Sequence, residues 1–198
     1  MNAKAEQKER SHETILESAA RLLREKGIAG ARVAEVMQGA GLTVGGFYAH
    51  FASKEALVDE ALHRTATAMR KRLFARLDEK PAADRAEVVI KRYVSAAHRD
   101  DLLHGCPLPA VVGEIGTTAP AHGAVLAEEL GALVADLEAQ LPPGRAVPRR
   151  HLALGLVALM YGALSLSRAL RGSELSEDVL RAARAVGAFA ARATAATE

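Results

Sequence analysis

The 198-residue sequence predicts an all-α protein of about nine helices. Apolar residues recur at every third or fourth position along most of the chain, which is the spacing of one helix face. No stretch alternates apolar and polar residues with a period of two, so we expect no strands. Aromatic residues make up only 4% of the chain and Trp is absent. The core must therefore be built mainly from Ala, Leu and Val, which we expect in packed helices.

Two amphipathic helices are expected at the start of the chain. The first runs from about residue 11 to residue 26, with an apolar stripe from Ile15 to Leu23, and Gly27 ends it. Residues 1–9 are polar and are expected to fray. The second helix is short, and three apolar residues form its inner face: Val33, Val36 and Met37.

Residues 39–55, GAGLTVGGFYAHFASKE, have the pattern of a helix-turn-helix. Gly39 and Gly41 close the preceding helix, because glycine accepts the left-handed conformation that a helix end often needs. Thr43 stands where an N-cap belongs, and Val44 to Phe51 form a helix of barely two turns. Two helices joined by a short turn that contains glycine are the helix-turn-helix arrangement.

The second helix of this pair is poorly suited to a protein core. Gly45 and Gly46 are poor helix formers, each about 1 kcal/mol less favourable than Ala. They remove side chains from one end of the helix, so its backbone can approach a sugar-phosphate chain. Tyr48, His50 and Lys54 follow, and all three can donate hydrogen bonds to phosphate. The alternative interpretation is a surface helical hairpin with polar tips.

A long linking helix is expected over about residues 54–78, with Ser53 as its N-cap. The next helix starts at Asp84 with Glu87 three residues on, as in a capping box, and ends near residues 104–105. A brief helix is then expected within residues 106–120, followed by a longer one over residues 121–141 and a run that is apolar nearly all round over residues 147–170. Ser176 starts the last helix.

The last two helices predict a symmetric dimer, because a helix that is apolar on every face needs partners on every face. The residues expected in the subunit's own core are Leu152, Leu156, Leu159, Ala163, Leu166 and Leu170. Gly155, Ala158 and Gly162 lie elsewhere and let a second helix approach closely. We expect a homodimer in which the last two helices of each subunit form a four-helix interface. The alternative is a monomer with deep burial.

The composition fits a soluble protein with a polyanionic partner. The net charge is +2, and the positive excess lies in residues 1–72, as a DNA-binding end requires. A single cysteine, Cys106, excludes an intramolecular disulfide and suits a reducing cytoplasm. The N-terminus lacks the apolar core of a secretory signal. The uncharged run of residues 152–167 is shorter than the roughly 20 residues that cross a bilayer, so no membrane is expected.

Residues 11 to about 62 resemble the DNA-binding domain of the TetR family of one-component repressors. The similar stretches are ILESAARLLREKG and VAEVMQGAGLTVGGFYAHFASKEAL. Beyond them only the layout is similar: a long connecting helix, a helical ligand-binding body and two closing dimerisation helices. The resemblance implies a three-helix DNA-binding domain over residues 1–53 and a ligand-binding and dimerisation domain over residues 54–198.

The resemblance also implies which residues meet DNA. Phosphate contacts are expected from Thr43, Tyr48 and Lys54, and the residues expected to face the major groove are Val44, Gly45 and Gly46, with His50 alongside. The chain departs from the family where Ala31 and Arg32 replace two hydroxyl residues and where Gly46 replaces Thr or Ser. Arg32 is then expected to contact a phosphate or a base edge.

Such a protein would be a dimeric regulator in the bacterial cytoplasm, associated with the nucleoid. Its two recognition helices would enter successive major grooves about 34–36 Å apart, on a roughly palindromic operator. A small, lipophilic or electrophilic effector would release it. The residues expected to line the effector pocket are Met69, Tyr93, Cys106, Met160 and Tyr161.

Cys106 also supports an alternative, a regulator that senses oxidants or electrophiles through a thiol. The segment HGCPL, residues 104–108, resembles a Gly-Cys segment found in part of the family. A neighbouring imidazolium, from His104, would favour the reactive thiolate. The competing interpretation is a small buried residue at a helix–helix joint.

We expect no enzyme, metal site or cofactor. The chain has no G-x-S-x-G motif and no glycine loop that cradles a phosphate. His98, Asp100, Asp101, His104 and His122 lack a metal-binding spacing. A helical adaptor that binds only protein is the remaining alternative, and it would lack the steep salt dependence of DNA binding.

Overall fold

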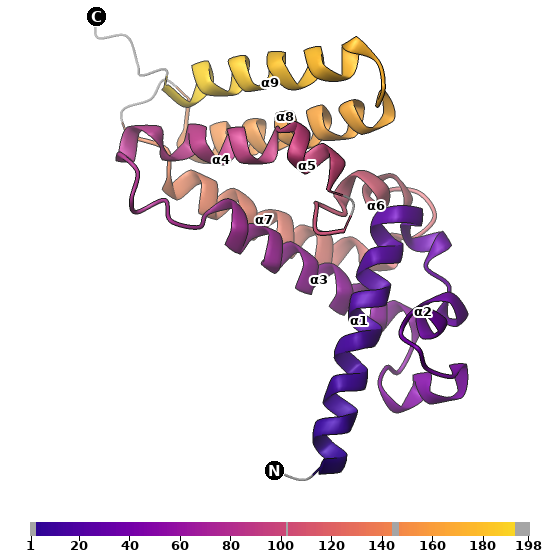
Figure 1. Ribbon diagram of the computed structural model, residues 1–198. Helices are drawn as coiled ribbons and strands as arrows, with labels where there is room; N and C mark the ends of the chain where they lie inside the picture. Colours follow the sequence, from indigo (N-terminus) through magenta and orange to yellow (C-terminus); the bar gives the residue numbers. More distant parts are fainter. Residues whose placement is uncertain (1–2, 102, 144–146, 193–198) are drawn as a thin grey trace, which may run out of the picture. The chain divides into compact units, whose positions relative to one another are not determined.

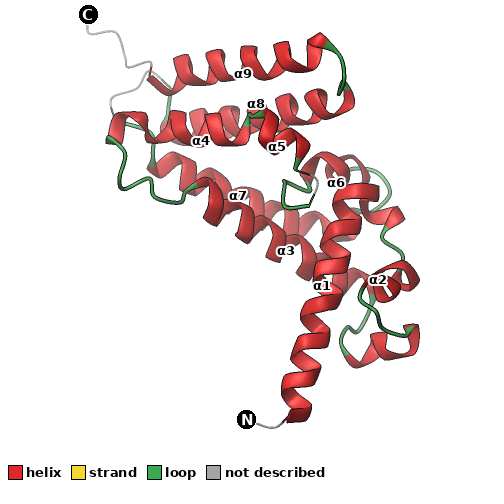
Figure 2. Cartoon of the chain, viewed as in Figure 1, coloured by secondary structure: helices red, strands yellow, loops and turns green. Residues whose placement is uncertain are grey.

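The computed structural model describes residues 3–101, 103–143 and 147–192. Over these residues the protein is all-α, with nine α-helices, three short 3-10 helices and no strand (Figure 1). Figure 2 shows the helices joined by loops and turns. The predicted fold class is therefore confirmed.

The chain divides into two compact units. Unit 1 contains residues 1–68 and 102–127, and unit 2 contains residues 69–101 and 128–198. The functional division after residue 53 stays a prediction.

Unit 1 is built from the N-terminal helices and one later segment of the chain. Its elements are α1 (Ala3–Gly30), α2 (Val33–Gly39), the 3-10 helix η1 (Val44–Ala49), the first part of α3 (Lys54–Leu73), α6 (Leu108–Ile115), the 3-10 helix η3 (Pro120–His122) and the start of α7 (Gly123–Ala139). One apolar core joins Leu23 of α1, Met37 of α2, Phe47 of η1, Leu57 of α3 and Val111 of α6. This core holds the helix-turn-helix in place.

Unit 2 contains the remaining helices. They are the end of α3, the 3-10 helix η2 (Ala82–Asp84), α4 (Arg85–Tyr93), α5 (Ala96–Asp100), most of α7, α8 (Arg149–Ala169) and α9 (Glu174–Arg192). Figure 1 shows α4, α8 and α9 side by side. Tyr93, Met160 and Leu180, one from each of these helices, are buried.

The N-terminal helix is longer than predicted. It begins at Ala3, so residues 3–9 are helical and the prediction that they fray was wrong. Good helix formers and an acidic residue in the first turn, Glu6, extend the helix without burying an apolar face. Gly27 interrupts the helix as predicted, with φ 71° and ψ −170°, and one further turn ends at Gly30.

The linking helix and the start of the next helix also differ from prediction. α3 ends at Leu73 rather than near residue 78, and Arg76, with φ 55°, turns the chain beyond it. Asp84 makes no side-chain cap, and Glu87 pairs with Lys91 instead, so the expected capping box is wrong.

The helix predicted to reach residues 104–105 breaks at Val94, where φ is −90° and ψ is 65°. Ser95 then caps α5, because its Oγ accepts the His98 N–H at 3.1 Å. α5 ends at Asp100.

The C-terminal helices follow the predicted order with two corrections. α9 begins at Glu174, and Ser176 lies inside it rather than at its N-cap. The Ser176 Oγ donates to the Ser167 carbonyl oxygen at 2.7 Å, which fixes α9 on α8. Leu156 and Ala163 are buried as predicted, whereas Leu166 is 55% exposed.

α8 has 21 residues, more than the predicted uncharged run. It is the one described helix whose length and composition would allow it to cross a membrane. However, 39% of its most apolar window is buried inside the protein, and the core helix of a soluble protein meets the same two criteria.

Candidate nucleic-acid interface

The helix-turn-helix consists of α2, a turn at Gly41 and η1. Gly41 has φ 69°, a conformation that suits glycine, and its N–H donates to the Gln38 carbonyl oxygen at 3.0 Å. The Leu42 N–H donates to the Met37 carbonyl oxygen at 2.9 Å. These bonds close α2 and direct the chain into η1.

One side chain anchors η1, and the others face solvent. Phe47 is 1% exposed, and its ring lies 5.8 Å from that of Phe51. By contrast, Val44 is 51% exposed and Tyr48 is 77% exposed. Thr43 occupies the N-cap position in an extended conformation, but its side chain makes no cap bond, so that part of the prediction was wrong. The segment thus presents an apolar side chain, a hydroxyl and a phenol on one short element.

Neither glycine of η1 is required by packing inside the protein. A Cβ placed on Gly45 would meet nothing within 4 Å. A Cβ on Gly46 would lie 3.8 Å from the Met37 Cε, which is ordinary van der Waals contact. Side chains at both positions are therefore compatible with the fold. Their absence leaves bare backbone, which favours the close approach of a bulky partner.

The two predicted cationic contacts have different surroundings. Arg32 is the N-cap residue of α2, and its side chain is exposed. Lys54 begins α3, and its Nζ donates to the Ile28 carbonyl oxygen at 2.8 Å. The sequence did not predict this bond, which ties the start of α3 to the end of α1.

His50 faces the protein more than predicted. Burial lowers its pKa, and the charges of His12 and Lys8 lower it further. Its ring lies 5.9 Å from that of His12, which stacks on Phe51 at 4.5 Å. The His50 Nδ1 is buried without a hydrogen-bond partner among the described residues. His50 is therefore neutral near pH 7, and it is a poorer phosphate ligand than an exposed cation.

Glu114 of α6 is a residue that the sequence analysis missed. Its Oε1 accepts the Ile28 N–H and its Oε2 accepts the Ala29 N–H, both at 2.8 Å. Both amides belong to the last turn of α1. No motif marks Glu114, and it lies far from Ile28 in sequence, so only the fold reveals the contact.

Unit 2 contains a pocket with a volume of about 250 Å³. It is lined by Met69, Arg72, Leu73, Arg92, Ser95, Ala97, His98 and Asp101. Of the five predicted pocket residues, Met69 lines it. Tyr93 and Met160 are buried and Tyr161 is half-buried. Cys106 is buried and belongs to unit 1.

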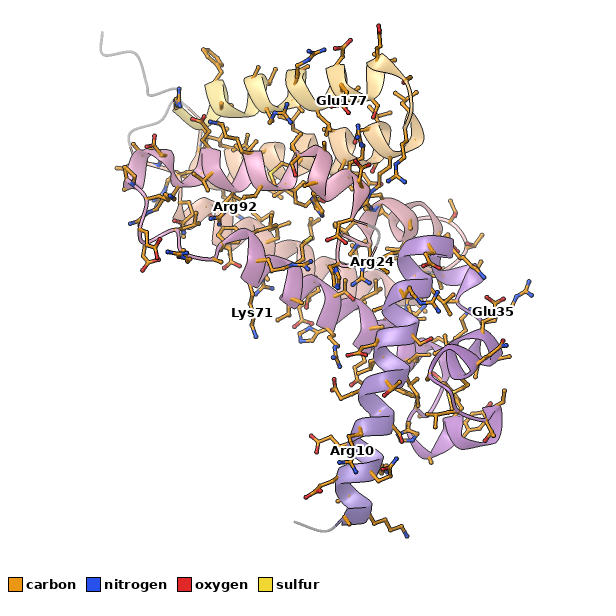
Figure 3. All side chains as sticks on the ribbon, in the orientation of Figure 1. Arg10, Arg24, Glu35, Lys71, Arg92 and Glu177 are labelled. Atoms are coloured by element: carbon orange, nitrogen blue, oxygen red, sulfur yellow. The ribbon has the colours of Figure 1, made fainter. Side chains whose placement is uncertain are left out.

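Charged and polar side chains line this pocket together with apolar ones. Arg92, labelled on α4 in Figure 3, donates to the Leu73 and Ala75 carbonyl oxygens at 2.6 and 2.8 Å. The His98 Nδ1 lies 2.7 Å from the Tyr93 carbonyl oxygen. Burial lowers the pKa of His98 to about 4, so it lines the pocket as a neutral imidazole.

Asp100 and His122, two of the residues considered as metal ligands, have protein partners. Asp100 pairs with Arg99 at 2.9 Å, and this guanidinium lowers the pKa of the Asp100 carboxyl group. His122 bonds to Asp59 at 2.7 Å. Cys106 is in no disulfide and is completely buried.

Comparison with known proteins identifies the helix-turn-helix. Residues 15–61 match the family model of bacterial regulatory proteins, tetR family. The HTH-type transcriptional repressor KstR2 of Mycobacterium tuberculosis is 46% identical over 48 residues, which is 24% of this chain and 24% of the repressor. The likeness in sequence is thus confined to about a quarter of each protein.

Likeness in structure extends over most of the chain. A TetR transcriptional regulator from Chloroflexus aurantiacus J-10-FL has a TM-score of 0.76 and 26% identity, covering 93% of this chain and 95% of that one. The reduced form of E. coli NemR has a TM-score of 0.74 and 22% identity, covering 87% and 94%. The latter supports the fold alone. Together these findings show that residues 15–61 match the bacterial regulatory proteins of the tetR family and that the chain has the fold of a TetR-family regulator.

Proposed function

We propose that the protein is a dimeric repressor that binds a duplex DNA operator and leaves it when a small molecule binds. As such a regulator it acts by binding rather than catalysis, and it works in the bacterial cytoplasm. The observation that carries the proposal is η1, an exposed element with bare backbone at Gly45 and Gly46. The relative KstR2 is named a transcriptional repressor, which supports repression.

The exposed residues of η1 match the chemistry of a DNA groove. Val44 can contact a thymine methyl group, whereas Gly45 and Gly46 offer only backbone. Thr43 and Tyr48 carry hydroxyl groups that donate to phosphate oxygens. Arg32 is the exposed N-cap residue of α2 and offers a cation to the DNA.

Exposed apolar residues on α8 and α9 support the dimer. Leu154 and Leu166 of α8 are 42% and 55% exposed, and Val186 and Phe189 of α9 are 56% and 76% exposed. Gly155 and Gly162 of α8 have open space where a Cβ would stand, so another helix can approach. A second copy of this chain would cover these residues through a twofold interface.

DNA binding can be tested with labelled duplexes. Fluorescence anisotropy would compare the DNA upstream of the protein's own coding region with random duplex of equal length at about 0.15 M salt. We expect at least a roughly thousandfold preference for the specific site. Equal affinity for the two duplexes would refute a sequence-specific regulator.

Footprinting on the same DNA would test the dimer model. Protection of two half-sites related by a twofold axis and separated by about one helical turn is expected. A single unpaired half-site would contradict dimeric binding. Affinity that did not change with salt would favour the protein-binding adaptor instead.

The thiol-sensor alternative requires Cys106 to react. Its side chain is completely buried, and the carbonyl oxygen of the preceding Gly105 accepts the Arg24 Nε–H at 2.9 Å. A thiol reagent should therefore label the native protein far more slowly than the protein in denaturant. Fast native labelling, with an oxidant response that Cys106→Ser abolishes, would favour the sensor.

A further inference from the structure

A carboxylate on α6 holds the last turn of α1 with two hydrogen bonds. The two Glu114 oxygens each accept one backbone N–H, from Ile28 and Ala29, at 2.8 Å. Both amides are at the start of a helical turn, where the N–H groups have no partner within the helix. Charge-assisted bonds of this kind are stronger than bonds between neutral groups.

The backbone at Gly27 is shaped around this carboxylate. A Cβ on Gly27 would lie 1.9 Å from the Glu114 Oε1 and 3.1 Å from the Ala110 carbonyl oxygen. Gly27 also has φ 71°, which disfavours any residue with a side chain. Two separate constraints therefore require glycine where Glu114 approaches.

A second bond continues from this turn to the helix-turn-helix. The carbonyl oxygen of Ile28, whose N–H is held by Glu114, accepts from the Lys54 Nζ at 2.8 Å. Lys54 is the first residue of α3 and the last of residues 42–54, which we call the recognition segment. Glu114, Ile28 and Lys54 thus form a continuous path from α6 to the recognition segment.

Glu114 belongs to the second stretch of unit 1, and another side-chain contact of α1 provides a comparison. Residues 102–127 belong to unit 1, but the residues before and after them belong to unit 2. The surface ion pair between Lys26 and Glu35, at 2.6 Å, also joins α1 to α2 but holds no helix-end amide (Glu35 is labelled in Figure 3).

We propose that Glu114 is a positioning residue of the DNA-binding site. Its carboxylate holds the turn at Ile28 and, through Lys54, orders the recognition segment for DNA. Without this carboxylate the two amides lose their acceptor, the turn no longer fixes Lys54 through the Ile28 carbonyl, and operator affinity falls. The effect on affinity rests on the proposed function, whereas the effect on order does not.

Hydrogen exchange of the full-length protein without DNA tests the positioning role. Glu114→Gln keeps the size of the side chain but places an NH₂ group against one backbone N–H. We expect the Ile28 and Ala29 amides and those of the recognition segment to exchange roughly tenfold faster, while α8 and α9 keep their protection. Glu35→Gln, the matched control, should leave all of these amides unchanged.

A result in which Glu114→Gln speeds exchange only at Ile28 and Ala29 would overturn the proposal, because Glu114 would then be a local cap. Lys54→Met breaks only the second bond of the path. It should loosen the recognition segment while Ile28 and Ala29 stay protected. If Glu114→Gln does not fold, Lys54→Met becomes the test of the proposal. Unchanged hydrogen exchange in residues 42–54 of Lys54→Met would then overturn it.

Anisotropy with operator and random DNA then tests the consequence for binding. Glu114→Gln should lower operator affinity roughly tenfold and lower affinity for random DNA much less, because specific contacts depend on geometry. Equal losses on both duplexes would overturn the positioning role. A wild-type protein without operator preference would refute the proposed function, and the exchange result would still decide the role of Glu114.

Discussion

Lys54 donates a hydrogen bond from its Nζ to the backbone carbonyl oxygen of Ile28, 2.8 Å away. This residue is also a predicted phosphate contact, so its ammonium group has two possible acceptors. An ammonium has three N–H donors and can bond the carbonyl and a phosphate at the same time. Lys54 can therefore contribute both to the order of the recognition segment and to DNA binding.

The Lys54→Met variant separates these contributions. We expect weaker DNA binding and a plot of log affinity against log salt whose slope is smaller by about 1.8, because the dimer loses two phosphate contacts, one from each subunit, at about 0.9 each. Lys71→Met is the matched control, since Lys71 is exposed on the same helix (Figure 3). A slope unchanged by Lys54→Met would show that Lys54 does not contact phosphate.

Gly45→Ala should separate folding from DNA binding. The new methyl group meets nothing within 4 Å, so thermal unfolding should be unchanged or slightly more favourable to the folded state. Operator affinity should fall roughly tenfold, because the methyl group holds the backbone away from the DNA. Gly131→Ala in the interior of α7, where there is also open space, should stabilise the fold by up to about 1 kcal/mol and leave operator affinity unchanged. Undiminished operator affinity of Gly45→Ala would contradict the predicted close approach.

Phe189→Lys should convert the dimer to a monomer. Phe189 is 76% exposed, and a buried ammonium at the proposed interface would lack a partner. Sedimentation equilibrium at micromolar concentration would measure the mass, and operator affinity should fall with it. Val147→Lys is the control, because Val147 is 48% exposed in the same unit but outside α8 and α9. A persistent dimer in Phe189→Lys would argue against this interface.

His98 should make unfolding stability depend on pH. Burial lowers its pKa from 6.5 to about 4, the charges of Arg168 and Arg72 act in the same direction, and the bond to Tyr93 opposes them. The unfolded chain thus binds a proton that the folded protein excludes. The stabilisation from a neutral His98 is complete above pH 6.5 and is lost as the pH falls to about 4.

Urea unfolding at a series of pH values would measure this effect. The free energy of unfolding should fall by at most about 1.4 kcal/mol per pH unit from His98 in that range. The free energy of unfolding of His98→Gln should fall less steeply than that of the wild type between pH 6.5 and pH 4. His151→Gln, at an exposed position of α8, should follow the wild type. Equal slopes for the wild type and His98→Gln would refute a neutral His98 in the folded protein.

Local sequence patterns were sufficient to predict most of the helices. Apolar spacing identified α2, α7 and α8 within a few residues, because burial of one face determines where those helices lie. The turn at Gly41 was also predictable, since its positive φ favours glycine. These features depend on residues that are close together in the chain.

Contacts between distant residues explain what the sequence could not predict. α5 ends early because the His98 and Arg99 carbonyl oxygens accept bonds from Arg168 of α8, at 3.1 and 3.2 Å, in place of a continuing helix. The carboxylate of Glu114 and the ammonium of Lys54 likewise find their partners only in the fold. Side-chain caps were predicted in part: Ser53 caps α3 by accepting the Ala56 N–H at 3.2 Å, whereas neither Thr43 nor Asp84 makes a cap bond.

Unit 1 is assembled from two stretches of chain. They are separated in the sequence by residues 69–101, which are 33 residues of unit 2. Val111 and Ile115 belong to the same core as Leu23 and Ile28, so a fragment that stops at residue 68 leaves that core unfinished. A chimeric regulator that receives unit 1 must therefore contain both stretches of chain. Domain exchange at a single crossover after α3 would separate residues that fold as one.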